Sequence, residues 1–177
     1  MVEEDSELKR LLDKITWKII SKSKGEKTVK VYRTKIVKVD SPHGIYRYDK
    51  TLREWILIDK DGDGFKPYKD GYYIIYFDNT KCAACRIYDL FWYPFIETIG
   101  KDLEGIEYII ILCEWFAKQC KSRSASNTFK EFNIHASPTT AFVEVRDLEI
   151  IRKELVRGVL KIEELVNKTM EFTGIKI

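Results

Sequence analysis

The sequence GYYIIYFDNTKCAACRIYDL, residues 71–90, contains the pattern that decides the fold. Residues 72–77 are six aromatic or aliphatic residues in succession, a run typical of a strand that is buried on both faces. Cys82 and Cys85 follow closely, at the beginning of a segment that favours a helix as far as about Ile99. A fully buried strand that leads directly into a helix predicts an α/β fold.

The rest of residues 70–177 continues this alternation of strand and helix. The further predicted elements are strands at 107–113, 140–145 and 150–156, and helices at about 126–132 and 160–172. The resulting order, β-α-β-α-β-β-α, predicts a mixed central sheet flanked by helices.

Residues 1–69 show a different pattern and are predicted to form an N-terminal extension. The predicted elements are a helix at 6–20, one strand or a pair of strands at 28–39, and a hairpin of strands at 44–48 and 53–58. The sequence therefore predicts two parts, a helix with a small antiparallel β extension at 1–69 and an α/β domain at 70–177.

The composition is that of a globular chain, with 177 residues, 45% hydrophobic and 33% charged. Its many Lys and Glu residues are typical of proteins from hot environments, so we expect a thermophilic source. No run is long enough to span a membrane, and the acidic start differs from a secretory signal, so the expected location is cytoplasmic with no membrane partner. The basic run at 14–38 could contact an acidic partner, but a net charge of only +3 favours a solvated face, and nucleic acid is not expected as a partner.

Cys82 and Cys85 have the spacing of a redox-active pair, which is significant when it follows a strand and begins a helix. At the first turn of a helix, Cys82 would be partly exposed and near free N–H groups that stabilise a thiolate, the nucleophilic form. Cys85, one turn further on, could then attack a mixed disulfide on Cys82. Lys81 and Arg86 place positive charge at both ends of the pair and are predicted to tune the thiol.

The segment FNIHASPTTAF, residues 132–142, resembles the thioredoxin segment that carries a cis-proline. Together with the cysteine pair and the terminal β-β-α order, it makes residues 70–177 similar to the thioredoxin superfamily. The resemblance implies that Pro138 is cis and packs against the cysteines, and that the backbone of Ser137 pairs with an extended substrate. It also implies protein substrates with disulfides and a separate redox partner, and no cofactor.

The residues around the cysteine pair depart from the family pattern in several ways. The residue directly before Cys82 is Lys81, where the family has Trp. The family also has a buried acid that accepts the proton of the second cysteine, and this acid aligns with Tyr76. Asp78 or a water molecule is then the alternative acceptor for the proton of Cys85.

Three other signals leave alternatives open. Cys113 and Cys120 could form a second disulfide, remain free thiols, or complete a zinc site with the first pair; their spacing is unusual for zinc, and no metal is expected. Residues 59–64, DKDGDG, match the beginning of a calcium loop, but a polar turn is the favoured interpretation. His135 is close in sequence to Pro138 and could affect the thiolate or be a surface residue.

These patterns predict a thiol–disulfide oxidoreductase that uses Cys82 and Cys85. The alternative is a binding or adaptor module with the same fold, whose basic N-terminal region recognises a partner and whose redox turnover is small.

Overall fold

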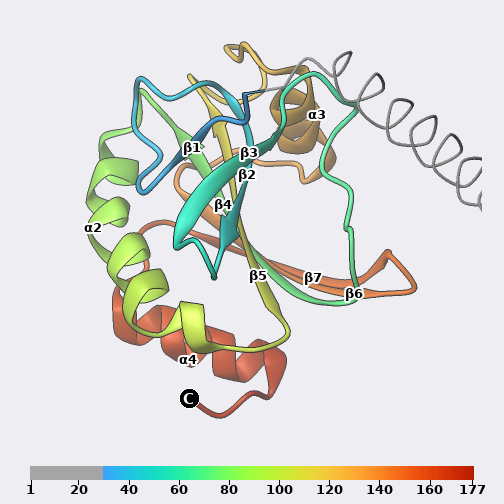
Figure 1. The fold of residues 1–177 in the computed structure, drawn as a ribbon. Coiled ribbons are helices and arrows are strands. Elements are labelled where there is room, and N and C mark those ends of the chain that lie inside the picture. The colour runs from blue at the N-terminus through green and yellow to red at the C-terminus, as the bar shows by residue number, and fades with distance from the viewer. Residues whose placement is uncertain (1–29) are drawn as a thin grey trace, which may run out of the picture. The chain divides into compact units, whose positions relative to one another are not determined.

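The computed structural model describes residues 30–177, which include a seven-stranded mixed sheet with helices on both faces (Figure 1). The strands lie in the order β1-β3-β2-β5-β4-β6-β7. Their bounds are β1 Arg33–Thr34, β2 Gly44–Asp49, β3 Glu54–Asp59, β4 Gly71–Asn79, β5 Ile106–Cys113, β6 Thr139–Arg146 and β7 Glu149–Arg157. The helices are α2 Ala83–Thr98, α3 Arg123–Glu131 and α4 Ile162–Thr173, with a short 3₁₀ helix at Gly100–Asp102.

Strand β4 lies near the centre of the sheet, where the continuous apolar run placed it. It pairs in parallel with β5 and antiparallel with β6. The side chains from Tyr73 to Asn79 are all buried, and so is every residue of β5. A strand that is covered on both faces needs apolar side chains on both sides. This explains why polar and apolar residues do not alternate in the sequences of β4 and β5.

Two apolar clusters fill the space on the two faces of the sheet. One contains the buried side of α2 together with α4, and includes Tyr76, Trp92 and Leu165. The other lies under α3 and includes Phe77 and Phe129, whose ring centroids are 5.1 Å apart. The prediction of a mixed central sheet flanked by helices is therefore confirmed.

The β2–β3 hairpin of the predicted N-terminal extension continues this same sheet. Strand β2 pairs antiparallel with β5, with Ile45 opposite Ile111. Residues 32–177 form one compact unit, so the hairpin is an addition to the α/β sheet within that unit. The predicted helix at 6–20 and most of the basic run at 14–38 lie outside the described residues.

The strand predicted at 28–39 is largely wrong over its described part. Only Arg33 and Thr34 form a strand, at the edge of the sheet opposite Ile56 and Trp55. The hydroxyl of Thr34 then donates to the carbonyl of Ile36 at 2.9 Å, which turns the chain. The Val37 side chain is buried, and the backbone carbonyl of Val37 accepts a hydrogen bond from the Tyr93 hydroxyl at 2.9 Å. These contacts outweigh the strand propensity of the segment.

The helix predicted at 126–132 also begins earlier than expected, because Ser122 caps it. The Ser122 hydroxyl accepts the amide N–H of Ala125 at 3.1 Å, which satisfies a free donor of the first turn. None of the helices within residues 30–177 is long and apolar enough to cross a membrane.

Trp55 of β3 packs the β2–β3 hairpin against the core. We expect Trp55→Ala to lower the free energy of unfolding by about 3–5 kcal/mol. Its side chain is fully buried, with ring centroids 6.2 Å from Trp92 and 6.1 Å from Tyr93 on α2. Urea titration measures the loss. Leu52→Ala, at a half-exposed position of the same hairpin, is the control and should change stability by less than about 0.5 kcal/mol. Equal effects of the two substitutions would show that Trp55 does not hold the hairpin in place.

Candidate redox site

The two cysteines of the motif lie at the beginning of α2 with free thiols. Cys82 is the N-cap residue, and its sulfur accepts the amide N–H of Cys85 at 3.1 Å. An N-cap side chain lies close to the other free N–H groups of the first turn and to the positive end of the helix dipole. The sequence predicted a partly exposed Cys82, but only 6% of this residue is exposed, because its side chain folds back over the helix terminus.

The segment before β6 brings a hydroxyl to the second cysteine. The Ser137–Pro138 peptide bond is cis, as the resemblance implied. The Ser137 hydroxyl oxygen lies 3.0 Å from the sulfur of Cys85, so residues from two distant parts of the chain meet at the thiol.

A buried group of charges lies next to Cys85, on the face of β4 that packs against α2. Asp78 is fully buried and accepts a hydrogen bond from the guanidinium of Arg86 at 2.5 Å. Asp89 accepts a hydrogen bond from Tyr76 at 3.0 Å and forms an ion pair with Arg86, also at 3.0 Å. The second oxygen of Asp78, Oδ2, has no hydrogen-bond partner within residues 30–177.

Burial dominates the titration of this group. It raises the pKa of Asp78 to about 7, with a further increase from the charge of Asp89 that Arg86 only partly offsets. Burial and the charge of Asp78 also raise the pKa of Cys85, while the hydrogen bond with Ser137 lowers it. A carboxyl group that titrates near neutral pH and interacts with a buried thiol has the properties of a general base.

The alignment of the family's buried acid with Tyr76 is misleading about the site. Tyr76 is buried and donates to Asp89 and, at 3.2 Å, to the carbonyl of Cys85, so it fixes α2 to the sheet. Asp78 is two residues further along β4 and therefore on the same face, where its charge acts on the Cys85 thiol. A signal was present in the sequence, because Asp78 and Asn79 are polar residues at the end of an otherwise apolar buried strand.

The charges predicted to act on Cys82 are both paired. Lys81 is exposed and lies 2.7 Å from Glu114, and this ion pair lowers the pKa of Glu114. Arg86 lies between Asp78 and Asp89. A paired charge has a weaker field at a third group, and the tuning of Cys82 by Lys81 and Arg86 stays a prediction.

His135 lies on the surface before the cis-proline. Its ring Nε2 is 2.5 Å from the side-chain oxygen of Asn133. Its exposure is that of a surface residue, one of the two alternatives that the sequence left open.

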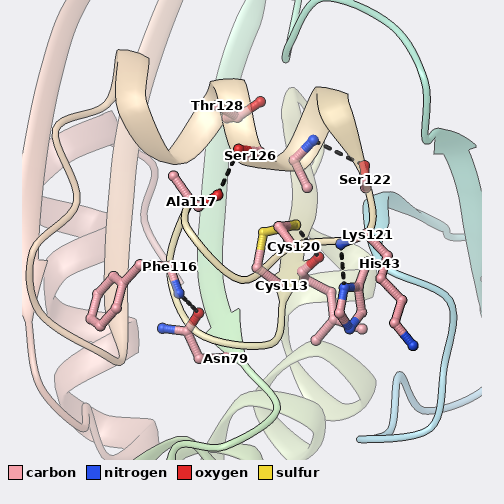
Figure 2. The surroundings of a disulfide bond; sticks show 12 residues. His43, Asn79, Cys113, Phe116, Ala117, Cys120, Lys121, Ser122, Ser126 and Thr128 are labelled. Atoms are coloured by element: carbon pink, nitrogen blue, oxygen red, sulfur yellow. Dashed lines mark hydrogen bonds between the residues drawn. A yellow bond between two sulfur atoms is a disulfide. The ribbon is translucent and has the colours of Figure 1, made fainter.

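Cys113 and Cys120 are bonded to one another in a disulfide, one of the alternatives that the sequence left open. Cys113 ends β5, and Cys120 ends the loop that follows it (Figure 2). Both sulfurs are therefore occupied, and they do not form the second half of a zinc site with Cys82 and Cys85.

Removal of this disulfide, as Cys113→Ala with Cys120→Ala, should lower the free energy of unfolding by about 2–3 kcal/mol. The reason is the entropy of the unfolded chain, which the bond restricts by closing a loop over a sequence separation of 7. Urea titration of the oxidised protein and the double variant measures the difference. An unchanged midpoint would show that the bond does not stabilise the fold.

The segment at 59–64 forms a turn. Asp59 accepts the amide N–H of Gly62 at 2.8 Å, and Asp63 pairs with Arg123 at 3.8 Å. In the part of the chain from residue 30 onward, no group of three or more His, Cys, Asp or Glu side chains is arranged to hold a metal ion.

Comparison with known proteins relates this arrangement to a fold. No protein-family model and no curated protein sequence matches the chain. Among solved structures, the thioredoxin from Aeropyrum pernix aligns over 75% of this chain and 97% of its own, with a TM-score of 0.50 and 16% identity. The thioredoxin from Trichomonas vaginalis aligns over 60% of this chain and 80% of its own, with a TM-score of 0.42 and 14% identity. On the first of these similarities and the sheet described above, the chain has a thioredoxin-like fold.

Proposed function

We propose that this protein is a thiol–disulfide oxidoreductase in which Cys82 is the attacking cysteine and Cys85 the resolving cysteine. The observation that carries the proposal is the environment of Cys85, which interacts with a buried carboxyl group of pKa about 7 and with the hydroxyl of Ser137. An inert buried thiol requires neither group, and a buried carboxyl group is costly to stability.

In the first step, the Cys82 thiolate attacks one sulfur of a substrate disulfide. A bond forms between Cys82 and that sulfur, the substrate disulfide breaks, and the other substrate sulfur leaves as a thiolate. The amide N–H of Cys85 that points to the Cys82 sulfur, together with the helix terminus, favours negative charge on the attacking atom. The backbone of Ser137, before cis-Pro138, would pair with the extended substrate chain.

In the second step, Cys85 attacks the sulfur of Cys82. The proton of the Cys85 thiol passes to Asp78, the buried carboxyl group that interacts with it, and the resulting thiolate forms the Cys82–Cys85 disulfide. The substrate leaves as its second thiolate, so it has gained two electrons and the cysteine pair has lost two. A dithiol reductant, the expected redox partner, then restores the pair.

The reduction potential of the Cys82–Cys85 pair tests this function. The protein is equilibrated in thiol–disulfide buffers of graded ratio, and its cysteines are trapped by alkylation and counted by mass. We expect a single two-electron transition, near about −270 mV if the protein is a reductant and nearer about −120 mV if it is an oxidant. If no disulfide forms between Cys82 and Cys85 at any buffer ratio, the proposed function is wrong.

A further inference from the structure

Asn79 is a fully buried side chain between the redox pair and the second disulfide, and the reaction described above does not use it. It is the last residue of β4, opposite Cys113 in the sheet. Its carboxamide contacts two segments. The side-chain nitrogen donates to the hydroxyl oxygen of Ser137 at 2.8 Å. The side-chain oxygen accepts the amide N–H of Phe116 at 2.7 Å, a contact that Figure 2 shows.

The orientation of this carboxamide follows from the chemistry of its partners. A backbone N–H can only donate, so the group that faces Phe116 must be the oxygen of Asn79, and the nitrogen must face Ser137. The Ser137 oxygen thus accepts from Asn79, and its own hydrogen is free to point to Cys85, 3.0 Å away. When Cys85 is a thiolate, its sulfur has no hydrogen, so Ser137 must be the donor of this contact, and a donor stabilises the thiolate.

The position of the Phe116 N–H depends in turn on the loop closed by the Cys113–Cys120 disulfide. Within this loop, the amide of Trp115 donates to the carbonyl of Gln119 at 3.0 Å. Ser126 of α3 donates to the carbonyl of Ala117 at 2.8 Å, which fixes the loop to the helix. Phe116 has a φ of +52°, a conformation that a non-glycine residue keeps only where its surroundings impose it.

These contacts form one continuous path: disulfide, loop, Phe116 N–H, Asn79, Ser137 hydroxyl and Cys85 sulfur. We propose that Asn79 is a positioning residue for the resolving cysteine, and that through it the Cys113–Cys120 disulfide controls the rate at which Cys85 attacks. This inference rests on the proposed function, since it assigns a role in the second step. When the disulfide is reduced, the loop no longer fixes the Phe116 N–H, Asn79 loses the contact that orients it, and Ser137 is no longer directed to Cys85.

The test separates the two chemical steps by stopped flow. The protein, with Cys82 and Cys85 reduced and the Cys113–Cys120 bond intact by mass, reacts with 5,5′-dithiobis(2-nitrobenzoate). Attack by Cys82 releases one nitrothiolate, and attack by Cys85 on the resulting mixed disulfide releases the second. We expect Asn79→Leu to slow the second release by about tenfold, the effect of losing the hydrogen bond from Ser137 to the Cys85 thiolate, and to leave the first release within about twofold.

Double-variant cycles distinguish positioning from a general loss of structure. Asn79→Leu should slow the second release in the otherwise unchanged protein but not in a Ser137→Ala background, because its effect passes through that hydroxyl. Likewise, Cys113→Ala with Cys120→Ala should slow the second release by about threefold or more, and not further when Asn79→Leu is present. In Asn79→Leu, the part of the pH profile that reports the titration of Cys85 should also move to higher pH, because Ser137 no longer stabilises the thiolate.

Thr169→Ala is the matched control for destabilisation. Thr169 is equally buried and donates a local hydrogen bond to the carbonyl of Leu165 in α4, away from the path. It should leave both releases within about twofold. An Asn79→Leu variant that slows the second release equally with and without Ser137, or not at all, would overturn the inference while the proposed function stands. If the unaltered protein never makes the second release, the proposed function itself is wrong, and this inference with it.

Discussion

Cys82→Ser should lower the rate of disulfide reduction by roughly 10³-fold or more, because a serine hydroxyl is a far weaker nucleophile than a thiolate. The proposed function assigns the first attack to this residue, whose sulfur lies at the helix terminus and accepts the amide N–H of Cys85. The measurement is the reduction of a disulfide-bonded reporter protein in the presence of excess dithiol. Serine can also act as an N-cap, so the variant should keep its fold.

Cys85→Ser is the matched variant for this experiment. It retains the attacking thiol and lacks the resolving one, so we expect it to accumulate a mixed disulfide with the reporter that Cys82→Ser does not form. Mass spectrometry of the trapped protein measures this species. If Cys82→Ser keeps full activity, the assignment of the attacking cysteine is wrong. If the unaltered protein does not reduce the reporter and Cys82→Ser still binds a protein partner, the chain is the adaptor module that the sequence left as the alternative.

Asp78→Asn should slow the second chemical step by about 10- to 100-fold at pH 7, because the amide cannot take the proton of Cys85. In the unaltered protein, the rate of this step should rise as the pH increases through about 7, where Asp78 loses its proton. In the variant, that rise should disappear and only the titration of Cys85 itself should remain. Stopped-flow measurement of the second nitrothiolate release between pH 5 and 9 tests both expectations. A pH profile that Asp78→Asn leaves unchanged would mean that another group, such as a water molecule, accepts the proton.

The same substitution should stabilise the folded protein. The pKa of Asp78 is raised from 3.8 to about 7, so between these values the folded state holds a proton that the unfolded state has lost. Stability therefore falls as the pH rises from about 4 to about 7 and stays lower above it. Asp78→Asn removes this cost, and we expect a gain of about 2–4 kcal/mol at pH 8 and little change at pH 4.

Urea titration of both proteins at the two pH values measures this gain. Asp61→Asn, at an exposed position, is the control and should show neither the gain nor the slower second step. A variant that is more stable and less reactive would be the sign of a group kept for chemistry at the expense of stability. If Asp78→Asn instead destabilises the protein at pH 8, the buried carboxylate contributes to the fold through Arg86, and the raised pKa is not its main property.

The central part of the fold could be predicted from the sequence because its signals are local. The apolar runs at 72–77 and 108–112 can bury all of their side chains only in strands that are covered on both faces, and the structure places them in β4 and β5. The cysteine pair and the segment around Pro138 were likewise visible as short motifs, and the cis peptide bond is present. The helix at 162–173 followed from its apolar spacing.

Other features depended on contacts between residues far apart in the chain. The segment at 28–39 has strand-forming residues, but its described part mostly leaves the sheet, because burial of Val37 decides its path. The partner of Cys113 could not be chosen from spacing, since a disulfide requires two side chains to meet in space. The carboxyl group that acts on the Cys85 thiol could not be identified by alignment, because Tyr76 and Asp78 lie on the same face of β4 and only the packing of α2 decides which of them is next to the sulfur.

The sequence by itself thus determined the two central strands, the order of the main elements after residue 70 and the position of the Cys82–Cys85 motif, since these depend on patterns within a few residues. Only the tertiary structure decided what surrounds each thiol. Asp78 and Asn79 adjoin in the chain, but they point to opposite faces of β4, one to the charges under α2 and the other to Ser137 and the disulfide-closed loop. Hydrogen bonds and charge interactions act over a few ångströms in space, so the groups that control the site are set by the packing of distant segments.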